Sequence, residues 1–407
     1  MMKNEKLSNN DSPLISVIVP VYNSAQYLRT CLESVCGQTY TKLQIICVND
    51  GSEDCSAEIL EEYGKKDTRI LILHQKNAGQ AAARNLALKH VAGEYIASLD
   101  SDDYLEKNAY EKVVACLRNY PGIDMVWFGT KVECLHDEKL RRIQEQYCRV
   151  EANGVRPLPI HTLHTLSGAM WNKVVRTELF CRFELNYPEG MVFEDACLFG
   201  MIAAVVKRVY FLPDKLYHYV LRQNSTMGMA REKASRCSDA LNILRPLHAF
   251  YCRWNLLPAA QSVFESFFVR AWGLYCSIMP VETHRQLAKE VLQLAQELQM
   301  PDDSDLMRRL LRMNDNCEYE RNLWGIFSVS LQWNGLCVRF LGVKILQEKL
   351  MPDSSVIKSL FYARRSGKEH WGFLGISVYG KIVSDFAVTR CLFCLPVSRT
   401  VPISIQK

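Results

Sequence analysis

The 407-residue chain is 48% hydrophobic and 23% charged, with a formal net charge of +5. This composition predicts two or three globular domains with substantial cores, and it excludes a low-complexity or natively disordered chain. Residues 1–13 are polar, so no secretory signal is expected, and the longest apolar run, 196–206, is shorter than the roughly 20 residues that span a bilayer. We therefore expect a reducing, cytoplasmic setting, in which most of the 16 Cys are small core residues.

Strand and helix signals alternate over the first 130 residues. Apolar runs rich in β-branched residues predict strands at 15–21, 43–48, 70–73, 95–99 and 123–128. Apolar residues at helical spacing predict the intervening helices, which are expected to stop at Gly37, Gly64 and Gly93. Such alternation predicts an α/β fold with a mostly parallel sheet, helices on both faces and ligands bound beyond the carboxyl ends of the strands.

The rest of the chain changes character twice. Residues 130–225 are irregular in pattern, and residues 230–315 keep the spacing of amphipathic helices. The tail repeats a short phrase, F-L-G-V-K-I-L at 340–346 and F-L-G-I-S-V-Y at 373–379, which predicts short strands. Residues 321–407 contain 12 Lys or Arg and 4 Asp or Glu. This basic, aromatic tail is expected either to pack against the helical region or to contact an anionic membrane surface.

Polar clusters follow three of the predicted strands, at Pro20–Asn23, Asn49–Ser52 and Asp100–Asp103. Each cluster alone is typical of a turn or a helix cap, and Asp103 could cap a helix that begins near Tyr104. The carboxyl ends of parallel strands open at one rim of a sheet, so the three clusters are expected to meet there. Neighbouring carboxylates repel one another, and this indicates a missing positive partner at the rim.

These motifs together resemble a family 2 glycosyltransferase domain of the GT-A fold, a Rossmann-like mixed sheet. The resemblance covers residues 14–104 through S-V-I-V-P-V-Y-N, C-G-Q-T-Y, V-N-D-G-S-E-D, N-A-G-Q-A-A-A-R-N-L-A-L and Y-I-A-S-L-D-S-D-D. It extends to 226 through A-M-W-N-K, F-E-D and Y-H-Y-V-L-R-Q-N-S-T, as in bacterial enzymes that build capsule, exopolysaccharide or O-antigen. The implied organisation is a GT-A domain with a nucleotide-binding half and an acceptor half, a helical region and a strand-rich tail, at 14–110, 111–226, 227–319 and 320–407.

The resemblance implies an inverting, metal-dependent transferase of the hexosyltransferase type. It would move a sugar from a nucleotide-diphosphate sugar, here a UDP-sugar, to a saccharide or lipid-linked saccharide. Mn²⁺ or Mg²⁺ would neutralise the leaving diphosphate. Asp102 would bind the metal and Asp100 the ribose, the metal or both, whereas His218 is either an additional metal ligand or a packed histidine.

By the same resemblance, Asp195 would deprotonate the acceptor hydroxyl, with Glu194 as its neighbour or as a sugar contact. The local alternative is that Asp195 only caps the apolar helix that follows it. Asp50 would accept a hydrogen bond from the nucleotide base. The other expected nucleotide-sugar contacts are Pro20, Tyr22, Asn23, Asn77, Gly79, Arg84, Asp100, Trp171, Lys173, Arg222 and Ser225.

Two other functions fit parts of the pattern. A nucleotidyltransferase can share a related sheet, but it usually has a Gly-rich, basic phosphate loop where this chain has P-V-Y-N. A non-catalytic nucleotide-sugar-binding or assembly protein would need no base, yet Asp50, Asp100, Asp102 and Asp195 are all present. No motif indicates nucleic-acid binding. A membrane contact through the tail would be peripheral, on the inner face of the plasma membrane.

Overall fold

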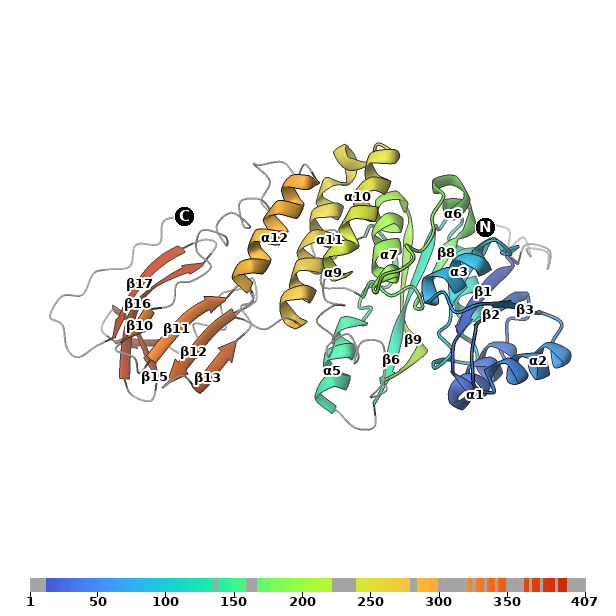
Figure 1. Ribbon diagram of the computed structural model, residues 1–407, viewed down its shortest axis with the longest axis horizontal. Coiled ribbons are helices and arrows are strands. Elements are labelled where there is room, and N and C mark those ends of the chain that lie inside the picture. The colour runs from blue at the N-terminus through green and yellow to red at the C-terminus, as the bar shows by residue number, and fades with distance from the viewer. Residues whose placement is uncertain are drawn as a thin grey trace, which may run out of the picture. The chain divides into compact units, whose positions relative to one another are not determined.

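The computed structural model describes residues 12–134, 138–158, 167–221, 239–278 and 284–298, together with strands between 321 and 393. The chain divides into two compact units, Met1–Leu306 and Met307–Lys407. The helical residues after the sheet belong to the first unit (Figure 1).

A nine-stranded mixed sheet forms the centre of the first unit, in the order β3-β2-β1-β4-β8-β6-β9-β5, with β7 paired to β9. Strands β1 to β4 are mutually parallel, β6 and β9 are parallel to each other, and β8 runs antiparallel between β4 and β6. The predicted mostly parallel α/β sheet is confirmed. The strands are β1 (Ile15–Val21), β2 (Leu43–Asp50), β3 (Ile70–Gln75), β4 (Tyr95–Ser98), β5 (Tyr104–Leu105), β6 (Met125–Glu133), β7 (Gly154–Arg156), β8 (Lys173–Arg176) and β9 (Val209–Val220).

Amphipathic helices cover the sheet, and α1 buries the predicted stripe of Leu28, Cys31, Leu32 and Val35. The predicted stop at Gly64 is wrong, because α2 continues through it to Lys66. A Cβ at this glycine would lie 2.7 Å from Ile72 Cδ1, so its role is close helix–sheet packing. The helices of this part are α1 (Ala25–Cys36), α2 (Ser56–Lys66), α3 (Gln80–Leu88), α4 (Ala109–Asn119), α5 (Glu138–Tyr147), α6 (Thr177–Phe183) and α7 (Glu194–Val205).

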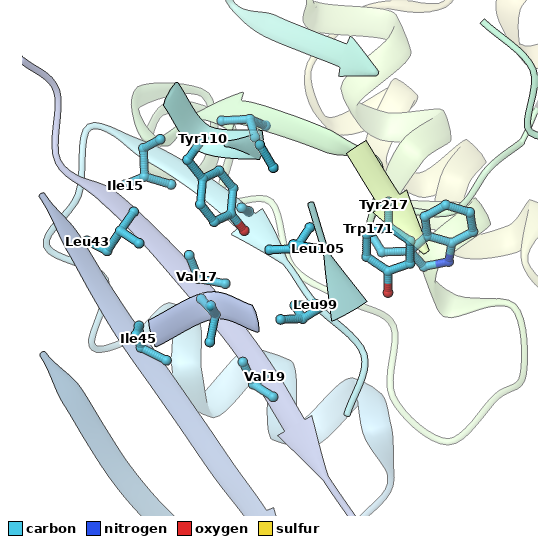
Figure 2. Packing of buried hydrophobic residues seen from close by; sticks show 14 of the residues in the cluster. Ile15, Val17, Val19, Leu43, Ile45, Leu99, Leu105, Tyr110, Trp171 and Tyr217 are labelled. Atoms are coloured by element: carbon cyan, nitrogen blue, oxygen red, sulfur yellow. The ribbon is translucent and has the colours of Figure 1, made fainter. Parts of the chain in front are cut away.

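The main core lies between the sheet and these helices and fixes the position of the rim. Ile15, Val17 and Val19 alternate along β1 and pack with residues of β2 and α4 (Figure 2). In the same sheet Val21 lies opposite Asn49. Consequently β1 and β2 end at the same level, and the polar residues that follow them emerge side by side.

Helix α7 is apolar on nearly every side and is buried, as the run 196–206 predicted. Helices α10 (Leu244–Arg253) and α11 (Leu257–Ile278) pack against it (Figure 1). The Tyr251 hydroxyl donates a hydrogen bond of 2.8 Å to the carbonyl oxygen of Gly200 in α7. Helices α9 (Asp239–Asn242) and α12 (His284–Glu297) complete this part. Among the described helices, none has the length and apolarity needed to cross a bilayer.

The second unit contains two antiparallel four-stranded sheets. The predicted strands are present, but each F-L-G phrase spans the junction of two strands: Phe340 pairs with Val343, and Phe373 pairs with Ile376. The strands are β10 (Arg321–Leu323), β11 (Phe327–Gln332), β12 (Gly335–Phe340), β13 (Val343–Glu348), β14 (Tyr362–Arg365), β15 (Lys368–Phe373), β16 (Ile376–Ser384) and β17 (Ala387–Phe393).

Candidate active site

The three polar clusters meet at one rim of the sheet, as predicted. The backbone N–H of Asn23 donates to Ser52 Oγ at 3.1 Å, and its side-chain Oδ1 accepts from the N–H of Glu53 at 2.8 Å. The hydroxyls of Ser24 and Ser101 are 2.7 Å apart. Hydrogen bonds therefore join the segment after β1 to those after β2 and β4.

Asp50 joins the second cluster to the loop that leads into α3. Its buried carboxylate accepts three hydrogen bonds, from the N–H groups of Ala78 and Gly79 at 2.8 and 2.9 Å and from Gln75 Nε2 at 2.7 Å. A carboxylate has about four acceptor positions, so one remains for a ligand. The predicted site residues Asn77 and Gly79 lie exposed on this loop.

The third cluster supplies hard oxygen ligands. Among the described residues, carboxylate oxygens of Asp100, Asp102 and Asp103 lie within 4.8 Å of one another. Such a group fits Mg²⁺ or Mn²⁺, which bind through one or two carboxylates plus phosphate oxygens. Asp100 and Asp102 are partly exposed and Asp103 is buried, so the first two are the residues that could share a cation with a ligand.

Asp103 has a different position from the one predicted. Strand β5 follows it, and α4 begins only at Ala109, so Asp103 is not a helix cap. Its carboxylate accepts from the Tyr217 hydroxyl at 2.7 Å and from the N–H of Val220 at 2.8 Å. Burial, together with the nearby charge of Asp100, raises the pKa of Asp103. This residue attaches the acidic segment to the end of β9.

Arg84, on α3, links the two halves of the site. Its guanidinium donates to Asp100 Oδ1 at 2.8 Å and to Glu194 Oε1 at 2.7 Å. The Arg84 side chain is only 5% exposed and the Glu194 side chain only 10%. Burial alone would lower the pKa of Arg84, but the carboxylate of Asp100 and then that of Glu194 outweigh it and raise the pKa. Arg84 is therefore a buried cation shared by two acids that lie 94 residues apart in the sequence.

Glu194 and Asp195 form the first turn of α7. The helix starts at Glu194 and its N-cap is Phe193, so Asp195 does not occupy the N-cap position. Burial, and then the neighbouring charge of Glu194, raise the pKa of Asp195 to about 7. A carboxylate with a pKa near neutrality is suited to take up a proton during a reaction.

Lys173 lies in the core instead of lining the rim. It is 1% exposed, and its ammonium donates to the carbonyl oxygens of Ser167 and Ala169 and to Asn172 Oδ1, at 3.2, 2.5 and 2.8 Å. Burial lowers its pKa to about 7. All three N–H donors are engaged by the turn before β8, so Lys173 supports that turn and has no donor left for a sugar.

His218 is likewise not brought to the acidic cluster. Its Nδ1 lies 2.9 Å from Glu133 Oε1 and its Nε2 lies 2.8 Å from Glu106 Oε1, while the ring stacks on Tyr104. Side chains alternate along a strand, so His218 occupies the face of β9 opposite that of Tyr217. Both ring nitrogens are engaged, which leaves neither for a metal shared with Asp102.

We therefore expect His218→Phe to leave Mn²⁺ affinity within about twofold of wild type. The variant should lower the melting temperature, because it removes the hydrogen bonds of His218 to Glu106 and Glu133, and such a bond contributes about 0.5–1.5 kcal/mol. Titration of Mn²⁺ followed by electron paramagnetic resonance measures the affinity. Loss of Mn²⁺ binding in a folded variant would restore His218 as a ligand.

The remaining predicted contacts fall into three groups. Pro20 is buried at the end of β1, where it pairs with Val48, and Tyr22 is 47% exposed just beyond it. Trp171 is buried and stacks on Tyr217 and Tyr219. Arg222 and Ser225 lie outside the described residues.

Tyr217 and Tyr219 of β9 lie at the candidate site but were not predicted from the sequence. The alternation in Tyr217-His218-Tyr219 was the available signal, because it places both tyrosines on one face of a strand. The hydrogen bonds of the Tyr217 hydroxyl with Asp103 and with the N–H of Asp100 show that this face meets the acidic cluster.

The fold and the rim together define an α/β protein with an acidic cluster at the carboxyl edge of a mixed sheet. Residues 16–177 match the family model described as Glycosyl transferase family 2. Glycosyltransferase GlyG of Streptococcus pneumoniae serotype 4 is 33% identical over 53% of this chain and 73% of GlyG. The chain belongs to the family 2 glycosyltransferases.

Two further similarities are weaker: one covers a smaller share of the relative, and the other has a lower sequence identity. Glycosyltransferase GlyA of Streptococcus pneumoniae serotype 4 is 34% identical over 54% of this chain, but the match spans only 32% of GlyA. S. aureus TarS 1–349, in a crystal structure in complex with UDP-GlcNAc, aligns with a TM-score of 0.48 at 21% identity, over 83% of this chain and 99% of that chain.

Proposed function

We propose that this protein is an inverting, metal-dependent glycosyltransferase that acts in cell-surface polysaccharide synthesis. It would transfer a sugar from a UDP-sugar to a saccharide or lipid-linked saccharide. The observation that carries the proposal is the buried bridge from Asp100 through Arg84 to Glu194. The Arg84 guanidinium joins the acidic rim to the turn that bears the candidate base. This contact supports a single site made from both halves. Membership of the family supports the same reaction.

The nucleotide would bind over the ends of β1 and β2. Tyr22 offers an exposed ring there, and Asn23 lies within the hydrogen-bonded rim. The remaining acceptor position of Asp50 suits the imide N–H of uracil. Asn77 and Gly79, on the loop held by Asp50, would lie near the sugar diphosphate.

Asp100 and Asp102 would hold a divalent cation, which when bound neutralises the negative charge of the leaving diphosphate. Asp195 would accept the proton of the acceptor hydroxyl. The hydroxyl oxygen forms a bond to the anomeric carbon as the bond from that carbon to the diphosphate oxygen breaks on the opposite face. Glu194, already paired with Arg84, would hold the turn in place beside Asp195.

Replacing Asp102 by Ala tests the metal assignment. We expect the variant to lose Mn²⁺-dependent UDP binding and transfer, because a single remaining carboxylate holds the ion poorly. Calorimetric titration of UDP in MnCl₂ and in EDTA measures the effect. Asp214→Ala, which removes a surface carboxylate paired with Lys112, is the matched control and should bind as wild type. Normal Mn²⁺-dependent binding by Asp102→Ala would refute the assignment.

We also propose that the basic tail contacts an anionic membrane from the cytoplasmic side. The strand register supports this, because Arg339 lies opposite Lys344 and Lys381 lies opposite Arg390. Like charges directly opposite each other destabilise a sheet. An anionic surface would relieve the repulsion, and each basic residue near such a surface contributes about 1 kcal/mol.

Flotation of the full-length protein tests the membrane contact of the tail. The vesicles contain phosphatidylglycerol as about one lipid in three, which makes their surface anionic. Replacing Arg339, Lys344, Lys381 and Arg390 by Gln should abolish flotation. A control variant replaces Arg321 and Arg364, of which Arg364 lies opposite Glu369 in the strand register, and should still float with the vesicles. Equal flotation of both variants, or no flotation of wild type, would contradict the contact.

A further inference from the structure

A stack of aromatic rings lies beside the acidic cluster. Trp171 stacks on Tyr217, with ring centroids 4.5 Å apart and planes 21° apart, and on Tyr219, at 5.2 Å and 26°. Trp171 and Tyr217 belong to the core, where they lie side by side (Figure 2). Tyr219 is packed against that core but is only partly buried. Tyr219 is thus the partly exposed end of a ring stack whose other members are buried.

The stack is anchored directly to the site. The Tyr217 hydroxyl donates to Asp103 at 2.7 Å and accepts from the N–H of Asp100 at 3.2 Å. The N–H of Val220, the residue after Tyr219, donates to Asp103 Oδ1 at 2.8 Å. Tyr219 is therefore held on both sides in the sequence by residues bonded to the acidic segment.

The strand order places Tyr219 away from the nucleotide half. Strand β9 is separated from β4 by β8 and β6, whereas the nucleotide clusters follow β1, β2 and β4. Tyr219 is the penultimate residue of β9. It lies near the end of a strand that is parallel to β6 and is the third strand beyond β4 in the sheet.

The surroundings of Tyr219 raise the pKa of its hydroxyl. Burial, and then the nearby carboxylate of Asp103, raise the pKa of the Tyr219 hydroxyl. The hydroxyl stays protonated at neutral pH and is a hydrogen-bond donor.

We propose that Tyr219 is the platform on which a pyranose ring of the acceptor saccharide stacks. This assignment rests on the proposed transferase function and names a subsite of that function. Binding sites for small ligands are lined by aromatic surface with a few polar groups that fix orientation. Here the ring would supply the apolar face, and Asp195 would accept the proton of the reacting hydroxyl. Because Trp171 already holds the ring in place, little conformational entropy would be lost on binding.

Methyl β-glucoside, methyl β-galactoside and methyl β-N-acetylglucosaminide are the acceptor probes, and UDP with MnCl₂ is the probe for the sugar-donor half. Saturation-transfer-difference NMR measures glycoside binding, and calorimetry measures UDP binding. We expect at least one glycoside to bind wild type, Tyr219→Leu to weaken it at least tenfold, and Tyr219→Phe to stay within threefold because the ring remains. UDP affinity should be unchanged in both variants.

Tyr210→Leu is the matched control, because Tyr210 lies on the same strand but packs with Tyr120. It should bind the glycoside and UDP as wild type. Wild-type binding of the glycoside by Tyr219→Leu, or no glycoside binding to a wild-type protein that binds UDP, would overturn the platform and leave the proposed transferase standing. Failure of wild type to bind UDP would count against the transferase itself.

Discussion

Asp195→Asn is expected to lower the rate of glycosyl transfer by about 10²–10⁴-fold, the usual contribution of a general base. The amide keeps the shape of the side chain but cannot accept the proton of the acceptor hydroxyl. Mn²⁺-dependent UDP binding should be unchanged, because Asp195 is not among the carboxylates that cluster at Asp100–Asp103. Transfer by wild type should rise with pH through about 7, where Asp195 loses its proton. Initial rates from pH 5 to 9 measure both effects.

The same substitution should stabilise the fold at high pH. The pKa of Asp195 is about 7 in the folded protein against 3.8 ordinarily, so between these values the folded state binds more protons than the unfolded state. Wild-type stability therefore falls as pH rises from about 4 to 7. Asp195 is partly exposed, so we expect Asp195→Asn to gain about 2 kcal/mol at pH 8, less than the full conversion of the shift, and little at pH 4.

Asp67 provides the control of opposite sign. Its pKa is lowered, chiefly by the hydrogen bond from Arg69, so Asp67→Asn should lose stability at pH 8. Melting temperatures of both variants at pH 4 and pH 8 make the comparison. A destabilised Asp195→Asn at pH 8, or an active one, would contradict the role given to Asp195.

Arg84→Met is expected to lower the free energy of unfolding by about 3–5 kcal/mol. Removing one partner of a buried ion pair leaves an uncompensated charge, and here two carboxylates, Asp100 and Glu194, lose their shared cation. Arg84→Lys should recover only part of the loss, because an ammonium lacks the planar fork that reaches both acids. Thermal unfolding measures all of these variants.

Arg245→Met is the matched control, because Arg245 pairs with Glu297 while about half exposed. Exposed pairs contribute about 0–1 kcal/mol, so this variant should melt close to wild type. Arg84→Met combined with Glu194→Gln should be more stable than Arg84→Met alone, since one unpaired charge is gone. If Arg84→Met unfolds at the wild-type temperature, the bridge is not the element that joins the two halves.

Local sequence patterns predicted the strands and the rim because both depend on neighbouring residues. Apolar runs rich in β-branched residues specified the strands, and parallel pairing then brought Asn23 to Ser52 and Ser24 to Ser101 without further information.

Local sequence patterns could not predict contacts between residues that are distant in the sequence. The motif A-M-W-N-K predicts that Lys173 contacts the ligand. Instead, Lys173 is buried between Trp127 and Phe199, and its ammonium donates to the turn before β8. The resemblance predicts that Arg84 contacts the nucleotide sugar. Instead, its guanidinium forms ion pairs with two carboxylates. The helix stop predicted at Gly64 failed for the same reason, because Gly64 allows close contact with Ile72 and does not end the helix. The stop predicted at Gly37 is confirmed as the C-cap of α1.

Thermal shift of the wild-type protein with a panel of UDP-sugars, in MnCl₂ and in EDTA, tests the central claim most directly. A ligand that binds the folded state raises the melting temperature by mass action. At least one UDP-sugar should stabilise the protein in MnCl₂, lose that effect in EDTA and lose it in Asp102→Ala. Stabilisation that persists in EDTA, or no stabilisation by any UDP-sugar, would contradict a metal-dependent nucleotide-sugar site at this rim.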